Sequence, residues 1–282
     1  MKTLSVIKQD LEFNSGLSSL IGVLKNIAVS QYRSMESRIK SFDKLKEAIY
    51  SFLEIIDPTQ VTHPFLNPQN QLQMVVAVTS DSGLLGALNK EVIDTALREL
   101  GQVPGRLVVI GERGKIYARE SKTSFAAFGG VREETIPVQA VQIRNYLLTK
   151  FLEESIGYLK VIYPRPISFT VQKIETVSFL PFRLEAREQK ETPPLMSEII
   201  LESRLADIVE YSVHLWMGQK LSEIFIFSKL AEYAARFAHL ERSAQRLKEM
   251  DQKLKLQYFR IRHELIDRNM RELFATRQIY AH

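Results

Sequence analysis

Two long segments at the ends of the chain repeat apolar residues every three or four positions. In the first segment this spacing links Leu17, Leu20, Leu24, Ile27, Met35, Ile39, Phe42, Leu45, Ile49 and Phe52. In the last segment it links Leu230, Ala234, Phe237, Leu240, Ala244, Leu247, Met250, Leu254, Tyr258, Ile261, Leu265 and Leu273. A narrow apolar stripe between charged faces is typical of helices that pair as a coiled coil.

Helix-breaking residues are confined to the middle of the chain. All ten prolines lie between Pro58 and Pro194, and nine of the twelve glycines lie between Gly83 and Gly157. Helices over residues 5–56 and 197–280 would span roughly 75 Å and roughly 120 Å at about 1.5 Å per residue. Neither fits inside a small globular domain, so we expect the two to pair antiparallel, with the C-terminal helix overhanging.

The middle of the chain alternates strand and helix patterns. Buried-strand runs at 73–78, 106–110 and 158–163 are separated by helix patterns at 89–100 and 138–155. This alternation predicts a parallel sheet with helices on both faces, and the alternating stretch within 168–182 predicts two more strands.

The expected fold class is α+α/β: a long antiparallel coiled coil of N- and C-terminal helices with a central Rossmann-like three-layer α/β domain. The expected boundaries are 1–57 for the N-terminal coiled-coil helix, 72–184 for the α/β domain and 195–282 for the C-terminal coiled-coil helix.

Composition narrows the class of protein further. The 282 residues are 45% hydrophobic and 25% charged, which supports a folded core, and the net charge of +5 is spread along the chain. The absence of cysteine excludes a thiol nucleophile and a disulfide framework and favours a reducing compartment. No run approaches 18 uncharged apolar residues, so we expect no direct insertion into a membrane.

The middle domain offers little for catalysis. The turn Ser80–Gly86 follows a strand, as a nucleotide-binding turn does, but it matches neither glycine-rich phosphate motif and has no lysine at the required offset. The five histidines show no metal-ligand spacing. We therefore expect no catalytic residue, no cofactor, no metal and no nucleic-acid partner, and we interpret Trp216 as a packing anchor.

Short motifs in the middle domain resemble those of one family. Thr79–Asn89 is similar to the S-D-R-G-L-C-G-x-x-N motif of F-type ATP synthase gamma subunits, with Ser82 in place of the usual Arg and Leu85 in place of the usual Cys. Ile110–Gly114 resembles the family's I-G-x-K-G, and Phe179–Phe182 resembles its L-L-P-L.

The two helical ends carry the resemblance across nearly the whole chain. Leu24–Ala28 resembles M-K-M-V-A, Glu232–Phe237 resembles S-E-x-x-A-R-M, and Tyr258–Arg262 resembles Y-N-x-x-R. The family's A-A-T-x-N and R-Q-x-x-I-T-x-E-L residues are largely replaced. The chain thus resembles a divergent member, and Tyr163–Ser168 is similar to the Y-N-R-P-x-S of an alternative prokaryotic ATPase lineage.

The resemblance implies a rotor shaft that couples ion-driven rotation of a membrane ring to ATP synthesis or hydrolysis. The implied partners are the alpha and beta subunits of the catalytic hexamer, the epsilon subunit and the membrane c-subunit ring. The implied location is peripheral, on the cytoplasmic face of a prokaryotic inner membrane. The partner-binding residues that it suggests are Lys25, Glu232, Arg236, Arg260, Arg262 and Arg268. The residues that it suggests for a structural turn are Ser80, Asp81, Gly83, Gly86 and Asn89.

Periodicity alone leaves a second interpretation open, a coiled-coil adaptor whose α/β head binds a small ligand or a protein. A shaft is one copy among three-fold partners, whereas an adaptor coil commonly self-associates. The sequence also leaves open the coupling ion, the main direction of the reaction, its regulation and the loops that contact the ring, for which Ser82–Gly83 and Glu185–Glu191 are candidates.

Overall fold

The computed structural model describes residues 3–37, 63–68, 70–182 and 204–279. Residue contacts divide the chain into two units, one formed by Val29–Arg236 and the other by Met1–Ala28 with Phe237–His282. The first is called the α/β unit below and the second the coiled-coil unit. Two helices contribute to both units, namely α1 (Leu4–Glu36) and α6 (Leu205–Ile279).

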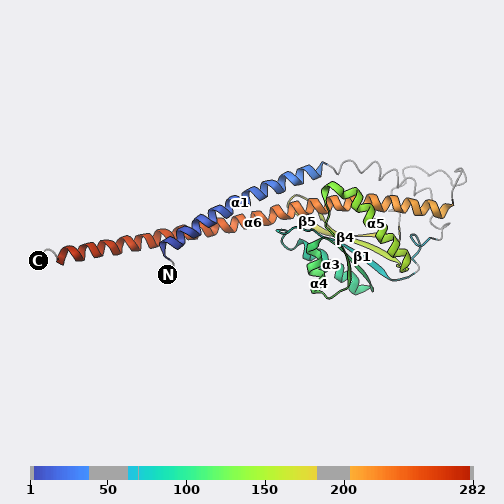
Figure 1. The fold of residues 1–282 in the computed structure, drawn as a ribbon, viewed down its shortest axis with the longest axis horizontal. Helices are drawn as coiled ribbons and strands as arrows, with labels where there is room; N and C mark the ends of the chain where they lie inside the picture. Colours follow the sequence, from blue (N-terminus) through green and yellow to red (C-terminus); the bar gives the residue numbers. More distant parts are fainter. Residues whose placement is uncertain (1–2, 38–62, 69, 183–203, 280–282) are drawn as a thin grey trace. The chain divides into compact units, whose positions relative to one another are not determined.

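A five-stranded sheet in the order β3-β2-β1-β4-β5 organises the α/β unit (Figure 1). The first four strands along the chain are parallel, and β5 runs antiparallel at the edge beside β4. The strands are β1 (Gln73–Val78), β2 (Gly105–Ile110), β3 (Phe125–Phe128), β4 (Tyr158–Pro166) and β5 (Gln172–Leu180).

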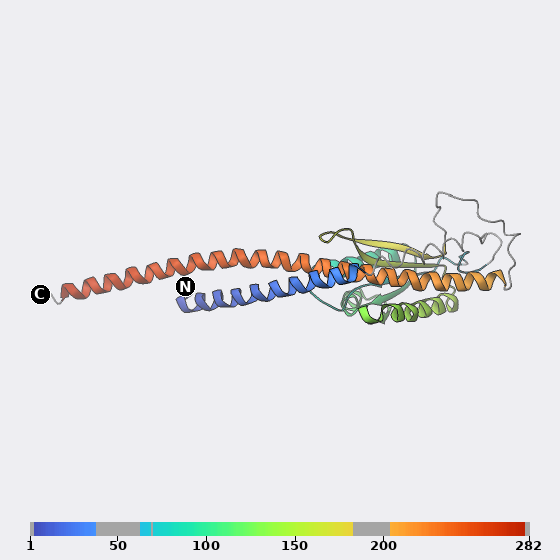
Figure 2. The same ribbon diagram turned by 90° about the horizontal axis from the view of Figure 1, so that it is seen from above.

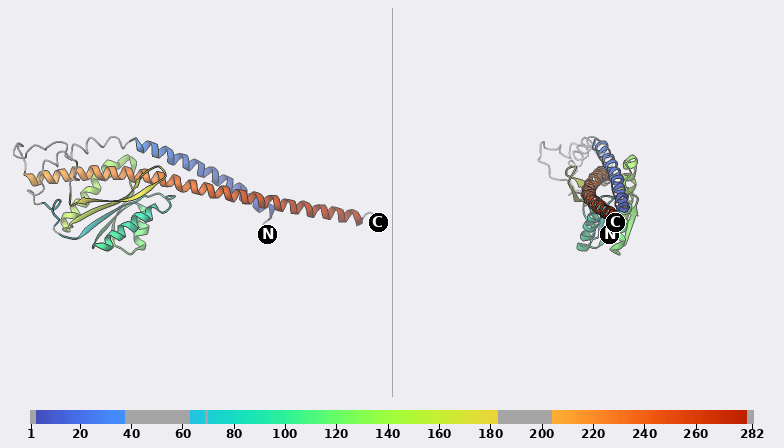
Figure 3. Two further views of the ribbon diagram at one scale, coloured as in Figure 1. Left: turned by 180° about the vertical axis from the view of Figure 1, so that it is seen from behind. Right: turned by 90° about the vertical axis from the view of Figure 1, so that its left-hand side faces the viewer.

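Helices cover both faces of this sheet, as the alternating pattern predicts. Figures 1 and 3 show α3 (Leu88–Gln102) and α4 (Glu112–Glu120) on one face. On the other face lie α5 (Ile136–Glu153), which follows the 3₁₀ turn η3 (Glu133–Thr135), and the first half of α6. The three-layer α/β architecture is confirmed, with α6 itself completing the third layer.

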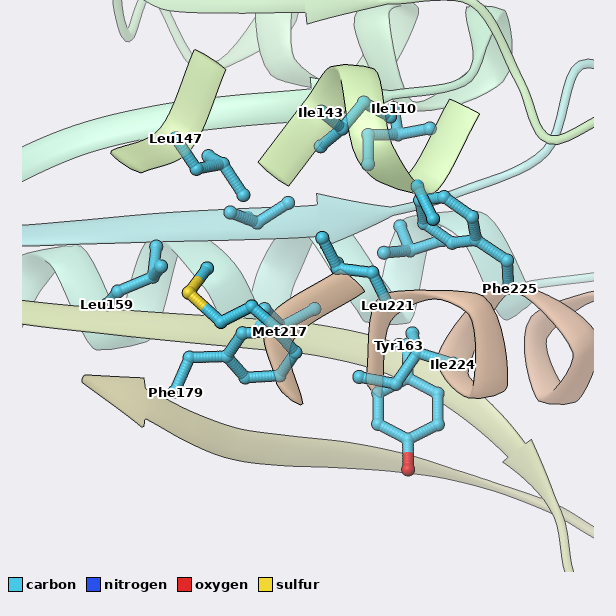
Figure 4. Packing of buried hydrophobic residues seen from close by; sticks show 14 of the residues in the cluster. Ile110, Ile143, Leu147, Leu159, Tyr163, Phe179, Met217, Leu221, Ile224 and Phe225 are labelled. Carbon is cyan, nitrogen blue, oxygen red and sulfur yellow. The ribbon is translucent and has the colours of Figure 1, made fainter. Parts of the chain in front are cut away.

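Side chains on the two faces of a buried strand belong to two separate hydrophobic cores. Val75 and Ala77 pack with α3 and α4, whereas Val76 and Val78 join the larger core beneath α5 and α6. In Figure 4, side chains from α5, the sheet and α6 gather in this larger core, with Phe225 of α6 among those that are fully buried. Trp216 packs edge-on against Phe179 and Phe182, at 5.2 and 4.9 Å between ring centroids, which confirms its role as a packing anchor.

The strand and helix predictions for the middle hold, with two corrections. The stretch 168–182 contains one strand, β5, because its first residues form the turn after β4, in which the N–H groups of Ile167 and Ser168 donate to the backbone oxygen of Val171. The elements α4 and β3 are missing from the sequence interpretation, since α4 is nine mostly polar residues and β3 is only four residues long. Such short elements lie below the window in which periodicity is informative.

In the coiled-coil unit, α1 and the second half of α6 pair antiparallel. The Asn14 side chain donates to the backbone oxygen of Leu247 at 3.1 Å, and Lys25 forms an ion pair with Glu241, so rising numbers on α1 meet falling numbers on α6. Figure 2 shows the two helices side by side, with α6 continuing beyond the start of α1. The predicted antiparallel pairing and the overhang are confirmed.

The predicted stripe on α1 is right in part. Met35 is buried and Leu17 and Leu24 are half-buried, but Leu20 and Ile27 are 54% and 47% exposed. The residues next to these two, Ile21 and Ala28, are buried instead, and they continue a seven-residue spacing from Ile7 and Asn14. One residue turns a helix by about 100°, and choosing only large apolar residues passed over the polar Asn14 and the small Ala28.

On α6 the predicted stripe is correct as far as Ile261, which is half-buried like Leu247 and Leu254, although Met250 is exposed. The predicted stripe residues Ile39, Phe42, Leu45, Ile49 and Phe52 lie outside the described residues, as do the expected boundaries at 57, 184 and 195. The three-part division therefore stays a prediction. In the described helices, no stretch is both long and apolar enough to cross a membrane.

Candidate functional site

The signature turn (residues 79–89) leaves the carboxyl end of β1 and enters α3. The backbone N–H of Ser80 donates to Oδ1 of Asn89 at 3.1 Å, and Nδ2 of Asn89 donates back to the Ser80 hydroxyl at 2.9 Å. The Ser80 hydroxyl in turn donates to the backbone oxygen of Ser82 at 3.0 Å. These bonds close the turn on itself, with Ser80 and Asn89 both buried.

Asp81 ties this turn to two neighbouring loops. Its Oδ1 accepts the backbone N–H of Glu112, the first residue of α4, at 2.8 Å and that of Gly130 at 2.9 Å. A helix N-terminus is where open α/β folds hold a phosphate. The chain's own carboxylate accepts the first amide of α4, so this helix end already has an anionic partner, and the Asp81 contacts are those of a structural turn.

Glycines let the backbone come close around Asp81. A Cβ on Gly130 would lie 2.4 Å from the Asp81 side chain, and a Cβ on Gly83 would lie 3.2 Å from the guanidinium of Arg113. Gly86 has a φ of 62°, and Leu84 adopts the same left-handed region with a φ of 64°. Left-handed φ is costly for a residue with a side chain, so Leu84 is a strained position and Gly86 relieves a second one.

The α6 segment 229–236 lies against the same edge of the sheet. Tyr233 Oη donates to Oε1 of Glu133 in η3, and Ala235 packs with Leu85 and Leu88 of the signature turn. Burial, with smaller contributions from the bond to Glu133 and from its charge, raises the pKa of Tyr233 above its ordinary value of 10. The hydroxyl therefore stays protonated and remains a donor at neutral pH.

Glu232 and Arg236 belong to this segment and pair with each other. The Glu232 carboxylate is buried and accepts Nζ of Lys229 at 2.9 Å and Nη2 of Arg236 at 2.7 Å. A buried carboxylate with two cationic partners is satisfied within the chain. Of the two predicted partner-binding residues, Glu232 is the less accessible, and only the partly exposed Arg236 retains a surface for a contact in trans.

Lys25 is engaged in the coiled-coil unit. Its ammonium pairs with Glu241 and lies 5.5 Å from the ring centroid of Phe237. The contact joins α1 to α6, so the described geometry gives Lys25 a role in pairing the two helices. Its predicted contact with another subunit stays a prediction.

Three predicted arginines lie on exposed faces near the end of α6. Arg260 bonds Glu264 at 3.2 Å and Arg268 bonds Glu272 at 3.0 Å, each one helical turn along. Within the described part of the chain, Arg262 has no hydrogen bond or ion pair. Its side chain is exposed, and its predicted contact with another subunit stays a prediction.

The sequence analysis does not predict three residues that make contacts between elements: Asn14, Glu133 and Tyr233. Asn14 stands seven residues from both Ile7 and Ile21, so a strict seven-residue count would have found it. Glu133 and Tyr233 are 100 positions apart, and nothing in the local sequence indicates that they meet.

Sites for a small ligand or metal are poorly developed. Over the described ranges, no three His, Cys, Asp or Glu side chains gather closely enough to hold a metal ion. A cavity of about 430 Å³ lies by the amino ends of β1 and β4, lined by Gln71, Gln73, Val103, Tyr158, Lys160, Ser178 and Pro181. The polar groups of two lining residues already have partners within the chain. Nε2 of Gln73 donates to the backbone oxygens of Glu99 and Val103, and Nζ of Lys160 pairs with the Glu99 carboxylate. Ligands of open α/β sheets bind at the opposite, carboxyl edge.

The fold and these contacts define a class: a protein with a three-layer α/β unit and a unit of two long antiparallel helices. A family model described as ATP synthase matches residues 3–277. The ATP synthase gamma chain of Chlorobaculum tepidum is 25% identical, with 98% of each chain covered, and that of Clostridium acetobutylicum is 22% identical, with 96% of this chain and 95% of the relative covered. The chain belongs to the gamma family of ATP synthase subunits.

A solved structure supports the same fold. The rotor of the Euglena gracilis mitochondrial ATP synthase contains a chain that superposes with a TM-score of 0.68 at 17% identity, covering 93% of this chain and 98% of that one. The α+α/β fold class is confirmed, and so is the family that the motifs indicate. The partner-binding residues drawn from that resemblance stay predictions.

Proposed function

We propose that this gamma subunit is the rotating shaft that transmits torque between an ion-driven membrane ring and the catalytic hexamer of alpha and beta subunits. The observation that carries the proposal is α6, one uninterrupted helix of 75 residues that begins in the α/β unit and ends in the coiled-coil unit. At about 1.5 Å per residue it is roughly 110 Å long. A long continuous helix is what a shaft requires.

The exposed surface of the coiled-coil unit suits enclosure by other subunits. Large apolar side chains are exposed on α6 at Leu256, Phe259, Met270, Leu273 and Phe274, and on α1 at Phe13, Leu20, Val23 and Ile27. Exposed apolar groups of this number indicate a surface that a partner covers. Charged side chains between them favour a contact that can slide, since large dry interfaces hold tightly.

A shaft acts without a catalytic residue of its own. Each rotational position presents a different face of α1 and α6 to three surrounding sites, and differential contacts bias each site among its nucleotide-bound states. Arg262 is the best candidate for an ionic contact with an acidic loop of a beta subunit, because its guanidinium has no partner among the described residues. Arg260 and Arg268 would first have to leave Glu264 and Glu272.

The α/β unit is the proposed foot of the shaft, in contact with the epsilon subunit and the c-subunit ring. This would place the chain peripherally at the cytoplasmic face of a prokaryotic inner membrane. Ser82–Gly83 lies in the signature turn and remains a candidate ring contact. The other candidate, Glu185–Glu191, lies outside the described residues.

The test is purification of the tagged chain from its native membranes, followed by native mass spectrometry of the intact complex. We expect one copy with three copies each of two nucleotide-binding subunits. Recovery of the chain alone or as a self-associated dimer would contradict the shaft and favour the adaptor. Arg262→Glu should then impair ATP-driven ion pumping more than Lys253→Glu, a charge reversal at another exposed position of α6.

A further inference from the structure

The α6 segment 229–236 is held at the carboxyl edge of the sheet by two contacts of different kinds. Ala235 is buried and packs with Leu85 and Leu88 of the signature turn. Two residues earlier, the hydroxyl of Tyr233 donates to the Glu133 carboxylate. The first contact sets how closely α6 approaches the turn, because alanine leaves room for two leucines. The second is directional.

Hydrogen bonds from α5 and from the signature turn hold the loop that carries Glu133. Gln139 of α5 donates to the backbone oxygen of Gly130 at 3.2 Å and accepts the N–H of Arg132 at 2.9 Å. The N–H of Gly130 donates to Asp81 at 2.9 Å. A chain of hydrogen bonds therefore connects Asp81, at the end of β1, to the loop that presents the Glu133 carboxylate.

Tyr233 is fixed from the helix side as well. The cationic groups of Lys229 and Arg236 lie 5.9 and 5.6 Å from the centroid of its ring, and the buried Glu232 holds both cations. Only 3% of Tyr233 is exposed. The ring thus has little freedom to leave Glu133 while α6 stays helical.

The remaining contacts of α6 in the α/β unit are mainly apolar. Exceptions among the described residues are the bond that Nη1 of Arg144 in α5 donates to the backbone oxygen of His214 at 3.1 Å, near the start of α6, and the guanidinium of Arg165, 5.1 Å from the ring centroid of Phe227. Side chains such as Leu221 and Phe225 bury area, but hydrophobic contact has no preferred direction and resists rotation of a helix about its own axis only through shape. A hydrogen bond to a carboxylate is strong and oriented. It adds an oriented restraint on the rotation of α6 to the restraint that close packing gives through shape.

We propose that Tyr233 and Glu133, together with the packing of Ala235 against the signature turn, form a clamp. The clamp prevents α6 from rotating about its own axis within the α/β unit when torque acts on the helix. The proposal rests on the rotor function proposed above. Tyr233 lies four residues before Phe237, the first α6 residue of the coiled-coil unit, so the clamp holds the helix immediately before it leaves the foot. The two residues are positioning residues for torque transfer.

The experiment uses the whole complex in inverted membrane vesicles with Tyr233→Phe. Membrane potential generated by ATP is followed with a voltage-sensitive dye, which reports H⁺ or Na⁺ transport alike. Hydrolysis with the potential collapsed should match the unsubstituted complex. Once the potential is steady, the ATP hydrolysis that continues measures rotation that is not coupled to ion transport. In Tyr233→Phe this rate should rise by up to about tenfold, which is the factor that corresponds to the loss of one charge-assisted hydrogen bond.

Matched variants separate the clamp from general loss of structure. Tyr211→Phe makes the same change on the same helix at a side chain that is 71% exposed, and it should leave both rates unchanged. Glu133→Gln keeps an acceptor and should restore most of the coupling that Glu133→Ala loses. The fluorescence of Trp216, buried in the α/β unit, confirms that each variant is folded.

Two outcomes would overturn different claims. If the unsubstituted complex pumps ions and Tyr233→Phe behaves like Tyr211→Phe, the clamp is wrong and the rotor function stands. If the chain does not assemble with the three-fold partners, the rotor function fails, and the clamp fails with it.

Discussion

One helix, α6, passes through two environments. Over Val209–Ala235 most side chains are buried, with α5 and the sheet supplying apolar partners. Over Glu241–Phe274 only a narrow stripe is half-buried, and the rest is exposed. The first segment is held by the chain itself. Among the residues that the structure describes, the second segment is covered only by α1, and its exposed apolar residues leave surface for other subunits.

The two environments also differ in the residues that they use. The first segment places three alanines close together at Ala231, Ala234 and Ala235, all buried, so that neighbouring elements can approach the backbone of α6. The second alternates leucines with long charged residues around a single stripe. Close packing favours a fixed setting, whereas a narrow stripe specifies pairing without enclosing the helix.

The largest test of this contrast is Phe225→Ala, in the core of the first segment. Removing a fully buried phenylalanine should destabilise the α/β unit by about 3–5 kcal/mol, because the lost contacts leave a cavity. Urea unfolding followed by the emission of Trp216, the only tryptophan, measures this unit. The same change at Phe259, which is half-exposed in the second segment, should cost less than about 1 kcal/mol. Equal losses would show that the two environments do not differ in this way.

The next test changes the polar residue in the coiled-coil seam, Asn14→Leu. A buried asparagine costs stability but fixes the register, so leucine should stabilise the pairing of α1 with α6 by about 1–2 kcal/mol while loosening its alignment. Circular dichroism follows the helical unit. The chain has no cysteine, so a disulfide between Lys25→Cys and Glu241→Cys reports the register without background. Slower or incomplete oxidation after Asn14→Leu is the expected result, and unchanged oxidation with lower stability would contradict it.

These two tests also mark how far the sequence could predict the molecule. The long helices and the buried strand 73–78 could be predicted from the sequence, because their patterns repeat over many residues or lack polar interruption. The face of α1 that is buried could not be predicted, since the facing helix determines that Asn14 and Ala28 are buried. The Glu133–Tyr233 contact joins residues brought together only by the sheet, and local patterns carry no trace of it.

The candidate surfaces divide in the same way. Family motifs led to Ser80, Asp81 and Asn89, and the structure brings all three into one hydrogen-bonded turn. The same motifs treated Arg260, Arg262 and Arg268 alike. Only the three-dimensional structure distinguishes them, because whether an arginine already has a partner one turn away depends on side-chain conformation.

A smaller effect comes from the buried tyrosines of the α/β unit. Burial, followed by the charge of Glu175, raises the pKa of Tyr163, and burial raises that of Tyr233, so the folded state holds these protons more tightly than the unfolded chain does. Their stabilisation is complete below pH 10, the unfolded value, and is lost as pH rises above it. Each tyrosine should lower the unfolding free energy by up to about 1.4 kcal/mol per pH unit.

Urea unfolding at pH 9.5 and 10.5, followed by Trp216, should show this loss, and Tyr163→Phe should reduce it. Tyr211→Phe is the matched control, since that side chain is exposed on the same unit. A stability that is flat over this interval would mean that neither hydroxyl is held as the structure places it.

The smallest effects on stability are expected at the arginines of the second segment. Arg260→Ala removes an exposed bond to Glu264 and should cost about 0.3–0.5 kcal/mol of helix stability, whereas Arg262→Ala removes no described bond and should cost less. Thermal unfolding of the isolated chain by circular dichroism measures both. In the assembled complex the order should reverse, with Arg262→Ala lowering the rate of ATP-driven pumping more than Arg260→Ala does, because a guanidinium that is unpaired within the chain has more to offer a partner. If Arg260→Ala has the larger effect in both assays, these arginines only stabilise the helix, and the exposed second segment of α6 makes no ionic contact with other subunits through them.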